Sequence, residues 1–234
     1  MLASAINCGV CGKPLVYATE SALRACSLCG KEERTLIYCP AGHYICDTCH
    51  SKSALDVLRQ VLDTTQSTDP AAIIEQIMAH PAVPMHGPEH HSIVPVAIIA
   101  AVRNAGYPVP RGAIEKALER ASKIPGGWCG LYGDCGAAVE VGIAVSVLTS
   151  ATPLTGKERS LALAATSSAL ERMLDNQPRC CKRASRVAVR AAVDFLYNQL
   201  GISLPQSAKI VCSYPLRNQQ CAREQCPFYD SRAL

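Results

Sequence analysis

The sequence lacks the features that mark several large classes of protein. Its N-terminus has no basic segment followed by an apolar stretch, so we expect no export signal and a cytoplasmic protein. The longest strongly apolar run, Ile93 to Val102, contains Pro95 and has about half of the roughly 20 residues that a membrane span needs. We therefore expect no transmembrane helix and no membrane partner.

Charge and common catalytic motifs are also scarce. Charged residues make up 18% of the chain, and the formal net charge of +4 is too small to favour nucleic acid as a partner. A Walker loop, a dinucleotide-binding glycine motif after a strand and a nucleophile elbow are all missing. These absences argue against the most common cofactor-dependent enzymes.

Cysteine, by contrast, is abundant. The chain has 14 cysteines, and half of them fall before residue 50. In a reducing cytosol such clusters are typical of metal ligands or redox thiols rather than disulfides. Residues 8–50 combine paired cysteines with turn glycines and show little helical periodicity. We therefore predict a metal-binding module at residues 1–50 and a second domain at residues 51–234.

The second domain is predicted to be all-α. Helical spacing of apolar residues and helix start signals indicate helices near 51–63, 70–80, 93–105, 111–123, 135–149, 157–175 and 179–200. Asp69 before Pro70 is a strong start signal. Prolines and glycines predict an irregular loop at 81–91, and the tail from about 205 is also loop-like. The expected fold class is mainly α, with a small zinc-binding module, an all-α domain and a cysteine-containing C-terminal tail.

The N-terminal segment has eight candidate metal ligands, enough for two tetrahedral zinc sites. They are Cys8, Cys11, Cys26, Cys29, Cys39, His43, Cys46 and Cys49. The segment resembles a zinc ribbon or a cross-braced, RING-like zinc module. Sequential pairing would place the first four on one ion, whereas cross-bracing would combine Cys8 and Cys11 with Cys39 and His43. Both remain open, and His50 is a spare candidate. Because closed four-ligand sites leave no open coordination position, we expect these metals to hold the fold rather than to catalyse.

A histidine-rich segment, His-Gly-Pro-Glu-His-His at 86–91, matches the residue order of an inverted zinc-protease motif. That chemistry needs a helix, and Gly87 with Pro88 argues against one. We favour a loop cluster in which His86 and at most one further histidine border a site. Ordinary capping or polar-loop histidines are the alternative.

A glycine-rich loop at 125–136 contains Cys129 and Cys135. Asp134 is a good helix cap, and Cys135 then opens an apolar helix whose small residues, such as Gly142, allow neighbouring elements to approach closely. Because the positive end of a helix stabilises a thiolate, we expect the Cys135 thiol to be acidified, reactive or metal-bound. We favour a functional pair of thiols here over a merely buried cysteine.

Three cations surround two adjacent cysteines in the segment 179–183, at another predicted helix start. Since cations are disfavoured at this end of a helix, a nearby anion is expected: thiolates, an iron–sulfur cluster or an anionic substrate near Arg179, Lys182 and Arg183. One cysteine could face the site while the other packs. A solvated basic turn is the alternative. The three tail cysteines could join one helical-domain cysteine in a cluster or bind another zinc.

The chain resembles a cysteine-rich family of anaerobic prokaryotes, the domain of unknown function numbered 5714, over nearly its whole length. The motifs that carry this resemblance are at 39–50, 86–91, 125–137 and 179–183. The resemblance implies no activity, although a methyltransferase attached to similar domains implies a one-carbon or modification context. A looser similarity links Cys135-Gly136-Ala137 to a redox-active family with the motif Gly-Cys-Ala-x-x-Gly, from which the order here departs.

These observations favour a metal-binding protein that carries zinc plus an iron–sulfur cluster or redox thiols. It would act in electron, sulfur or one-carbon chemistry of anaerobic metabolism, with a redox or methyltransferase protein as partner. A zinc-binding adaptor whose basic patch engages an acidic partner is one alternative. A metal-dependent enzyme is another, with His86, Glu89 and Cys135 near an open metal position and Glu89 as general base. The candidate catalytic residues are Cys135, Cys129 and Glu89. The candidate cofactor ligands are Cys129, Cys135, Cys180, Cys181, Cys212, Cys221, Cys226, His86 and His90.

Overall fold

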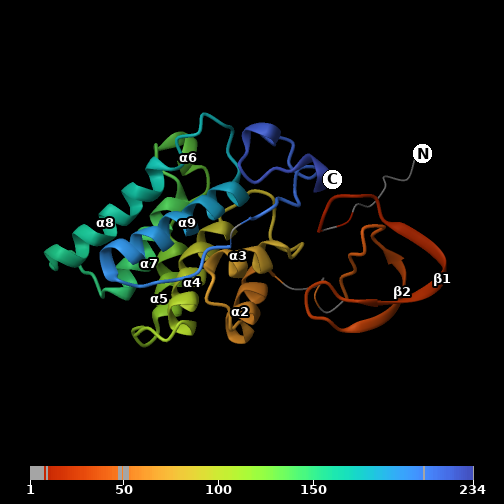
Figure 1. The fold of residues 1–234 in the computed structure, drawn as a ribbon, viewed down its shortest axis with the longest axis horizontal. Helices are drawn as coiled ribbons and strands as arrows, with labels where there is room; N and C mark the ends of the chain where they lie inside the picture. The colour runs from red at the N-terminus through yellow and green to blue at the C-terminus, as the bar shows by residue number, and fades with distance from the viewer. Residues whose placement is uncertain (1–7, 9, 47–48, 50–52, 208, 234) are drawn as a thin grey trace.

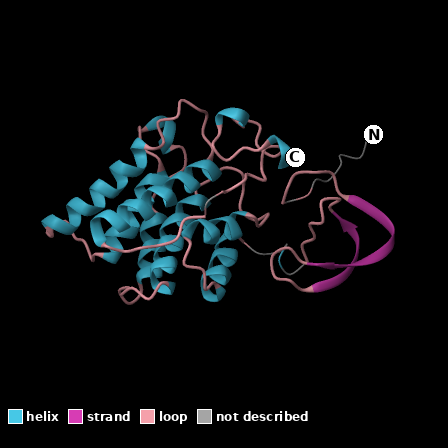
Figure 2. Cartoon of the chain, in the orientation of Figure 1, coloured by secondary structure: helices cyan, strands magenta, loops and turns pink. Residues whose placement is uncertain are grey.

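The computed structural model describes residues 8, 10–46, 49, 53–207 and 209–233. Over these residues the chain is mainly α, with eight α-helices and one two-stranded sheet (Figure 2). The cysteine-rich N-terminal part lies at one end of a helical body, and the C-terminal tail runs over that body (Figure 1). The expected fold class is therefore confirmed, whereas the domain boundary at residue 50 stays a prediction. His50 lies outside the described residues.

The N-terminal part is built around one hairpin. Strands β1 (Val16–Ala25) and β2 (Glu32–Tyr38) pair antiparallel, with a break in register between Tyr17 and Ala22. The buried residues beside the hairpin form two small groups that consist mostly of cysteines. A segment with so little buried apolar surface needs another source of stability, which agrees with a fold held by ligands.

The helices follow the predicted segments closely. Their bounds are α2 Ala54–Thr64, α3 Pro70–Met78, α4 Glu89–Asn104, α5 Ala113–Ala121, α6 Trp128–Leu131, α7 Gly136–Leu148, α8 Gly156–Glu171 and α9 Cys181–Leu200. Helix α6 was not predicted. Helix α4 begins earlier than expected, so the end of the predicted loop 81–91 is in fact its first turn. No strand occurs among the described residues after residue 50.

Side chains at two helix starts explain where those helices begin. Ser53 and Asp56 form a reciprocal capping box at the start of α2, with the Asp56 amide donating to Ser53 Oγ (3.2 Å). Asp69 accepts the amide N–H of Ala71 (2.8 Å), and Pro70 occupies the first helical position of α3. The start signal predicted at Asp69 is therefore confirmed.

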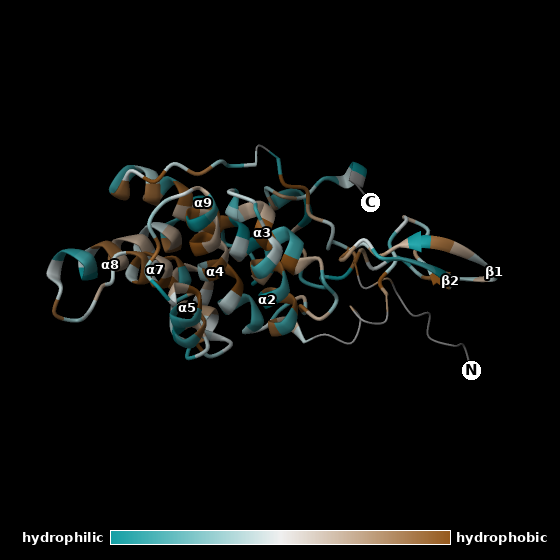
Figure 3. Cartoon of the chain, turned by 90° about the horizontal axis from the view of Figure 1, so that it is seen from below, coloured by the Kyte–Doolittle hydropathy of each residue, from teal (hydrophilic) through white to brown (hydrophobic). Residues whose placement is uncertain are grey.

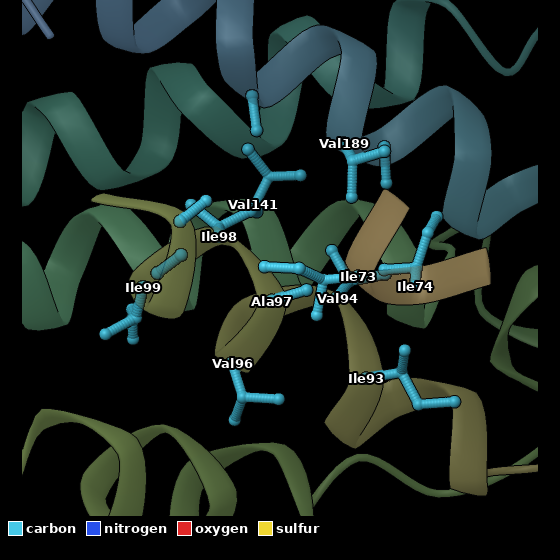
Figure 4. Packing of buried hydrophobic residues seen from close by; sticks show 14 of the residues in the cluster. Ile73, Ile74, Ile93, Val94, Val96, Ala97, Ile98, Ile99, Val141 and Val189 are labelled. Carbon is cyan, nitrogen blue, oxygen red and sulfur yellow. The ribbon is translucent and has the colours of Figure 1, made fainter. Parts of the chain in front are cut away.

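Helix α4 forms the centre of the core. It packs against α2, α3, α5, α7 and α9, and it is buried from Ile93 to Val102 (Figure 4). Figure 3 shows the apolar colouring along this helix within the body of the molecule. A helix that is apolar on all sides belongs in an interior. Within the described part of the chain, no helix combines the length and apolar character needed to cross a membrane.

Helix α7 approaches α8 closely at a glycine. A Cβ atom at Gly142 would lie only 2.8 Å from the carbonyl oxygen of Ala162 and would also meet the side chain of Thr166. Real Cβ atoms essentially never come this close to backbone. The small residue predicted to allow close packing is therefore required where these two helices meet.

The C-terminal tail is attached to α9 through buried aromatic and cationic side chains. Arg186 of α9 is 1% exposed and pairs with both carboxylate oxygens of Glu75 (2.6 and 2.7 Å). Its guanidinium lies over the rings of Tyr214 and Phe228, at 5.6 and 5.3 Å from their centroids. The Cys212 amide donates to the Phe228 carbonyl (2.7 Å), which ties the two ends of the tail together. These contacts hold the tail cysteines against the start of α9. Two short 3₁₀ turns, η1 (Arg223–Gln225) and η2 (Ser231–Ala233), complete the tail.

Candidate metal and thiol sites

The eight N-terminal candidate ligands gather into two groups of four. Within each group all ligand atoms lie within 4.8 Å of one another: Cys8, Cys11, Cys39 and His43 in one, and Cys26, Cys29, Cys46 and Cys49 in the other. The Sγ atoms of Cys11 and Cys39 are 3.5 Å apart, and those of Cys29 and Cys46 are 3.7 Å apart. With Zn–S bonds of about 2.3 Å, two thiolates on a tetrahedral ion are about 3.8 Å apart, so these spacings fit Zn²⁺. The first pair joins the third and the second joins the fourth, which is the cross-braced arrangement.

Tight turns aim backbone N–H groups at these sulfurs. Gly12 and Gly30 adopt φ of 80° and 74°, a conformation that glycine takes without strain, and donate to the carbonyls of Cys8 and Cys26 (2.9 Å each). The Cys46 amide donates to Cys26 Sγ (3.4 Å). Burial raises the pKa of Cys26, but N–H donors from Cys46 and its own turn outweigh burial and lower that pKa to about 6. The turns therefore favour the ionised form of the Cys26 thiol, which is the form that binds a metal.

Crowding of the thiols works in the opposite direction. Burial, the Cys39 thiol and the charge of Cys8 together raise the pKa of Cys11 to about 11. Several thiolates this close together repel one another, so they cannot all be ionised without a cation between them. The donor set and its spacing are those that a zinc ion would satisfy.

A second set of cysteines lies where the tail meets α9. Cys180, Cys212, Cys221 and Cys226 line one small cavity together with Arg183, Arg186, Tyr214 and Asn218. In the described part of the chain only the two N-terminal groups bring three or more ligand atoms within 4.8 Å of one another, so this tail set is more widely spaced. The convergence of the three tail cysteines with one helical-domain cysteine was one of the predicted arrangements.

Helix capping and turns position the tail set. Cys180 is the N-cap of α9, and its Sγ accepts the amide N–H of Arg183 (3.4 Å). The side-chain amide of Asn218 also donates to this sulfur (3.6 Å). The amides of Cys221 and Cys226 donate to carbonyls three residues earlier, those of Asn218 and Arg223 (3.1 and 2.7 Å). Both tail cysteines are therefore held on tight turns.

His86 borders the tail set without entering it. Its Nε2 lies 3.2 Å from Oδ1 of Asn218, and Asn218 in turn contacts Cys180. Burial lowers the pKa of His86, and the charges of Arg179 and Lys182 lower it further. His86 thus reaches the cysteines through Asn218, a residue that sequence analysis did not single out.

The cations at the start of α9 have partners within the protein. Lys182 is buried and donates from Nζ to the carbonyls of Met78 (2.9 Å) and Val83 (3.4 Å). Burial lowers its pKa to about 7. Arg183 pairs with Asp175 at 2.8 Å. The predicted nearby anion is thus Asp175 for Arg183, whereas Lys182 is held by carbonyl groups, and a cluster or an anionic substrate near Arg179, Lys182 and Arg183 stays a prediction.

A third set of thiols gathers at helix starts. Cys135 is the N-cap of α7, Cys181 is the first residue of α9, and the exposed Cys129 lies on α6. Burial raises the pKa of the Cys135 thiol, the amides of Ala137 and Ala138 lower it by less, and the charges of Cys129 and Cys181 raise it further. The predicted helix start is confirmed, but the predicted acidification is wrong because burial exceeds the effect of the helix end. The charges of the three thiols act on one another's pKa.

The adjacent cysteines 180 and 181 therefore belong to different sets. Cys180 lines the tail cavity, whereas Cys181 does not, and burial raises the pKa of the Cys181 thiol while the Gly87 amide and the charge of Arg179 lower it and the charge of Cys129 raises it. Sequence analysis placed candidates from both sets in one site. The structure separates them into a tail set and a helix-start set, defined as Cys129, Cys135 and Cys181.

The remaining predicted residues make other contacts, and the ring of His91 packs against Gly136, next to Cys135. His90 is buried and donates from Nδ1 to the Gly87 carbonyl (3.3 Å), and burial lowers its pKa to about 3. His91 donates from Nδ1 to the Ile124 carbonyl (3.1 Å). Glu89 is exposed and lines a separate groove formed by residues of α2, α4 and α5. A catalytic role for Glu89 stays a prediction.

Sequence analysis missed Glu140, which lies on α7. It is 0% exposed, and neither of its carboxylate oxygens has a hydrogen-bond partner among the described residues. Burial raises its pKa well above the ordinary range, and the charges of Cys135 and Cys181 add to the effect. A detectable signal was present, because Glu140 is the single charged residue in the apolar segment 136–148.

Comparison with known proteins places the chain in a family. The model described as "Family of unknown function (DUF5714)" matches residues 58–229. That range contains every cysteine of the tail set and of the helix-start set, whereas the N-terminal cysteines lie outside it. Searches of curated proteins and of solved structures gave no match. The chain therefore belongs to the family of unknown function DUF5714.

Proposed function

We propose that this is a metal-binding redox protein in which two zinc ions hold the N-terminal module and an iron–sulfur cluster is bound by the tail set. The observation that carries the proposal is the convergence of four thiols on one cavity, without the mutual spacing within 4.8 Å that the two N-terminal groups have. Four cysteine thiolates are the usual ligands of two-iron and four-iron clusters. A cluster spreads its ligands further apart than a single ion does.

The surroundings of the tail set also suit an anionic cluster. Arg183 and Arg186 line the cavity, and hydrogen bonds from the Arg183 amide and from Asn218 reach Cys180 Sγ. Cations and donors to the ligand sulfurs stabilise a cluster and tune its reduction potential. All four cysteines are only half-buried, which leaves the cluster near enough to the surface to exchange electrons with a partner protein. Electron transfer in anaerobic metabolism is the role that this arrangement supports best.

The two N-terminal sites would have a structural role. One site would have three thiolates and one histidine nitrogen as ligands, and the other would have four thiolates. A zinc ion with four protein ligands has no coordination position left for a substrate. The module is supported by little else, because its buried groups consist largely of the ligands themselves. We therefore propose that zinc stabilises the folded structure of the residues before 50 and takes no part in the redox site.

Anaerobic purification with zinc, iron and sulfide analysis tests this proposal. We expect zinc together with iron and acid-labile sulfide, and a visible absorbance that reduction bleaches. Cys221→Ser should lose iron and keep zinc, whereas Cys26→Ser should lose zinc and keep iron. Cys129→Ser is a matched control, because Cys129 is an exposed cysteine outside both metal sets. A colourless protein with zinc bound at the tail set would overturn the redox proposal and leave a zinc-binding adaptor.

A further inference from the structure

Helix α8 has apolar residues on two opposite faces, of which the body of the protein covers one. Ala165 and Ala169 are 0% exposed and belong to the core, where α8 packs against α7 and α9. On the opposite face Leu163 is 56% exposed, and Ala164 is exposed beside it. Helix α8 lies at the outer edge of the helical body (Figure 1). A surface helix usually presents a polar face to water, so the second apolar face needs a reason.

The exposed apolar surface continues beyond both ends of the helix. Leu154, two residues before α8, is 95% exposed, and Leu174, three residues after it, is 83% exposed. Single apolar residues on a surface are ordinary, whereas several large ones along one element indicate an interaction surface.

Small residues make the exposed face of α8 suitable for close packing. Ser160, Ala164 and Ser167 are exposed and follow one another at spacings of four and three, so they share this face with Leu163. The Ser160 hydroxyl donates to the Gly156 carbonyl (2.8 Å), so a covering partner leaves no unpaired donor there. Small side chains allow the axes of two helices to come close. The face therefore suits another helix.

The charges at the two ends of this face oppose the dipole of the helix. Lys157 lies in the first turn, at the positive end, and Glu171 is the last residue, at the negative end. Both are exposed, and no ion pair within the described part of the chain involves either of them. Glu158 is half-buried, and Arg172 is paired with Asp194 (2.6 Å). An antiparallel copy of α8 would bring its acidic end to Lys157 and its basic end to Glu171.

We propose that α8 is the interface of a homodimer, in which the α8 helices of two copies pack antiparallel about a two-fold axis. The axis passes between positions 163 and 164, at the centre of the exposed face. Leu163 of each copy then contacts Ala164 of the other. Ser160 of each copy faces Ser167 of the other. Because a two-fold axis repeats every contact, one self-complementary face is sufficient for the assembly.

The same register extends to both ends of the contact. It brings Lys157 of each copy to Glu171 of the other, and Leu154 to the neighbourhood of Leu174. A helix of 16 residues is about 24 Å long, so the contact is smaller than the roughly 800 Å² per partner of a standard interface. We therefore expect a dimer that dissociates on dilution, with a dissociation constant on the order of 10 μM.

Sedimentation equilibrium of the full chain tests the proposal at protein concentrations from about 1 μM to about 1 mM. Anaerobic, reducing conditions prevent disulfides between copies. The wild type should pass from monomer to dimer over this range, and Leu163→Asp should stay monomeric. Carbodiimide coupling of a mixture of isotope-labelled and unlabelled protein should join Lys157 to Glu171 in peptide pairs that combine both kinds of chain.

Charge reversal distinguishes the antiparallel geometry from others. Lys157→Glu and Glu171→Lys each make both ion pairs of the dimer repulsive, so each should raise the dissociation constant about tenfold. The double variant restores opposite charges and should dimerise like the wild type. A mixture of the two single variants should form a heterodimer, because each contact then joins an acid to a base. Lys116→Glu changes an exposed lysine on α5 and is the matched control, which should dimerise like the wild type.

A monomer at every concentration would overturn the proposal. A dimer that resists Leu163→Asp and both charge reversals would also overturn it, since that dimer would use another face. The substitutions leave the buried side of α8 intact, so the circular dichroism spectrum should not change. Iron and zinc are measured on the same samples. Because the interface contains no proposed metal ligand, loss of the metals and loss of the dimer are recognised separately.

Discussion

Replacing Glu140 by Gln should change how the stability of the protein depends on pH. The folded protein holds a proton on this fully buried carboxyl, because burial and then the thiol charges of Cys135 and Cys181 raise its pKa. The unfolded chain releases that proton near the ordinary pKa of 4.5. Above this value the folded state binds one more proton than the unfolded state.

The sign and size of the effect follow from proton linkage. When the folded state holds the extra proton, the free energy of unfolding falls as pH rises, by about 1.4 kcal/mol per pH unit for one group. From about pH 5 upward the wild type should therefore lose stability relative to Glu140→Gln, by at most about 1.4 kcal/mol for each pH unit. The loss continues until the pH passes the pKa of the folded state. The variant has no proton to release and escapes this penalty.

Urea unfolding at several pH values measures this difference, with helical circular dichroism and the fluorescence of Trp128, the only tryptophan, as probes. Buried His90 contributes the opposite slope, because its lowered pKa makes stability fall as pH drops below about 6.5. That contribution is common to both proteins and cancels in the difference. The control Glu171→Gln, which changes an exposed carboxyl at the end of α8, should follow the wild type at low protein concentration, where the chain is monomeric. Parallel pH profiles for wild type and Glu140→Gln would refute the buried, protonated state of this carboxyl.

Three further predictions concern packing, ion pairing and metal. Gly142→Ala should lower the free energy of unfolding by about 1–3 kcal/mol, since the new Cβ would lie 2.8 Å from a backbone oxygen of α8. Unchanged unfolding in urea would show that the two helices are further apart. Arg186→Met should lower the free energy of unfolding by about 3–5 kcal/mol in the same assay, because it leaves Glu75 without its buried partner. A decrease of less than about 1 kcal/mol would contradict a stabilising ion pair. Chelation of zinc should collapse the NMR signals of the β1–β2 hairpin and spare those of α4, because the core around α4 contains none of the proposed zinc ligands. Simultaneous loss of both sets of signals would count against separate stabilisation.

Much of the helical part could be predicted because its signals are local. The Asp69–Pro70 pair specifies a helix start by capping and by backbone geometry, and the apolar run from Ile93 to Val102 has the composition of an interior helix. The start of α4 was missed because Gly87 and Pro88 suggested a break. Proline fits the first positions of a helix, however, and Pro88 in fact occupies the N-cap position of α4.

The sites were less predictable because their geometry is non-local. Cysteine spacing identified both N-terminal ligand sets, but the choice between sequential and crossed pairing depends on how the hairpin between them folds. Likewise, sequence cannot tell which way the adjacent Cys180 and Cys181 point, since this depends on where the tail and α7 lie against α9. Glu140 was overlooked among apolar neighbours. A single acidic residue within such a segment indicates either a buried ionisable group with a functional role or a wrongly assigned helix.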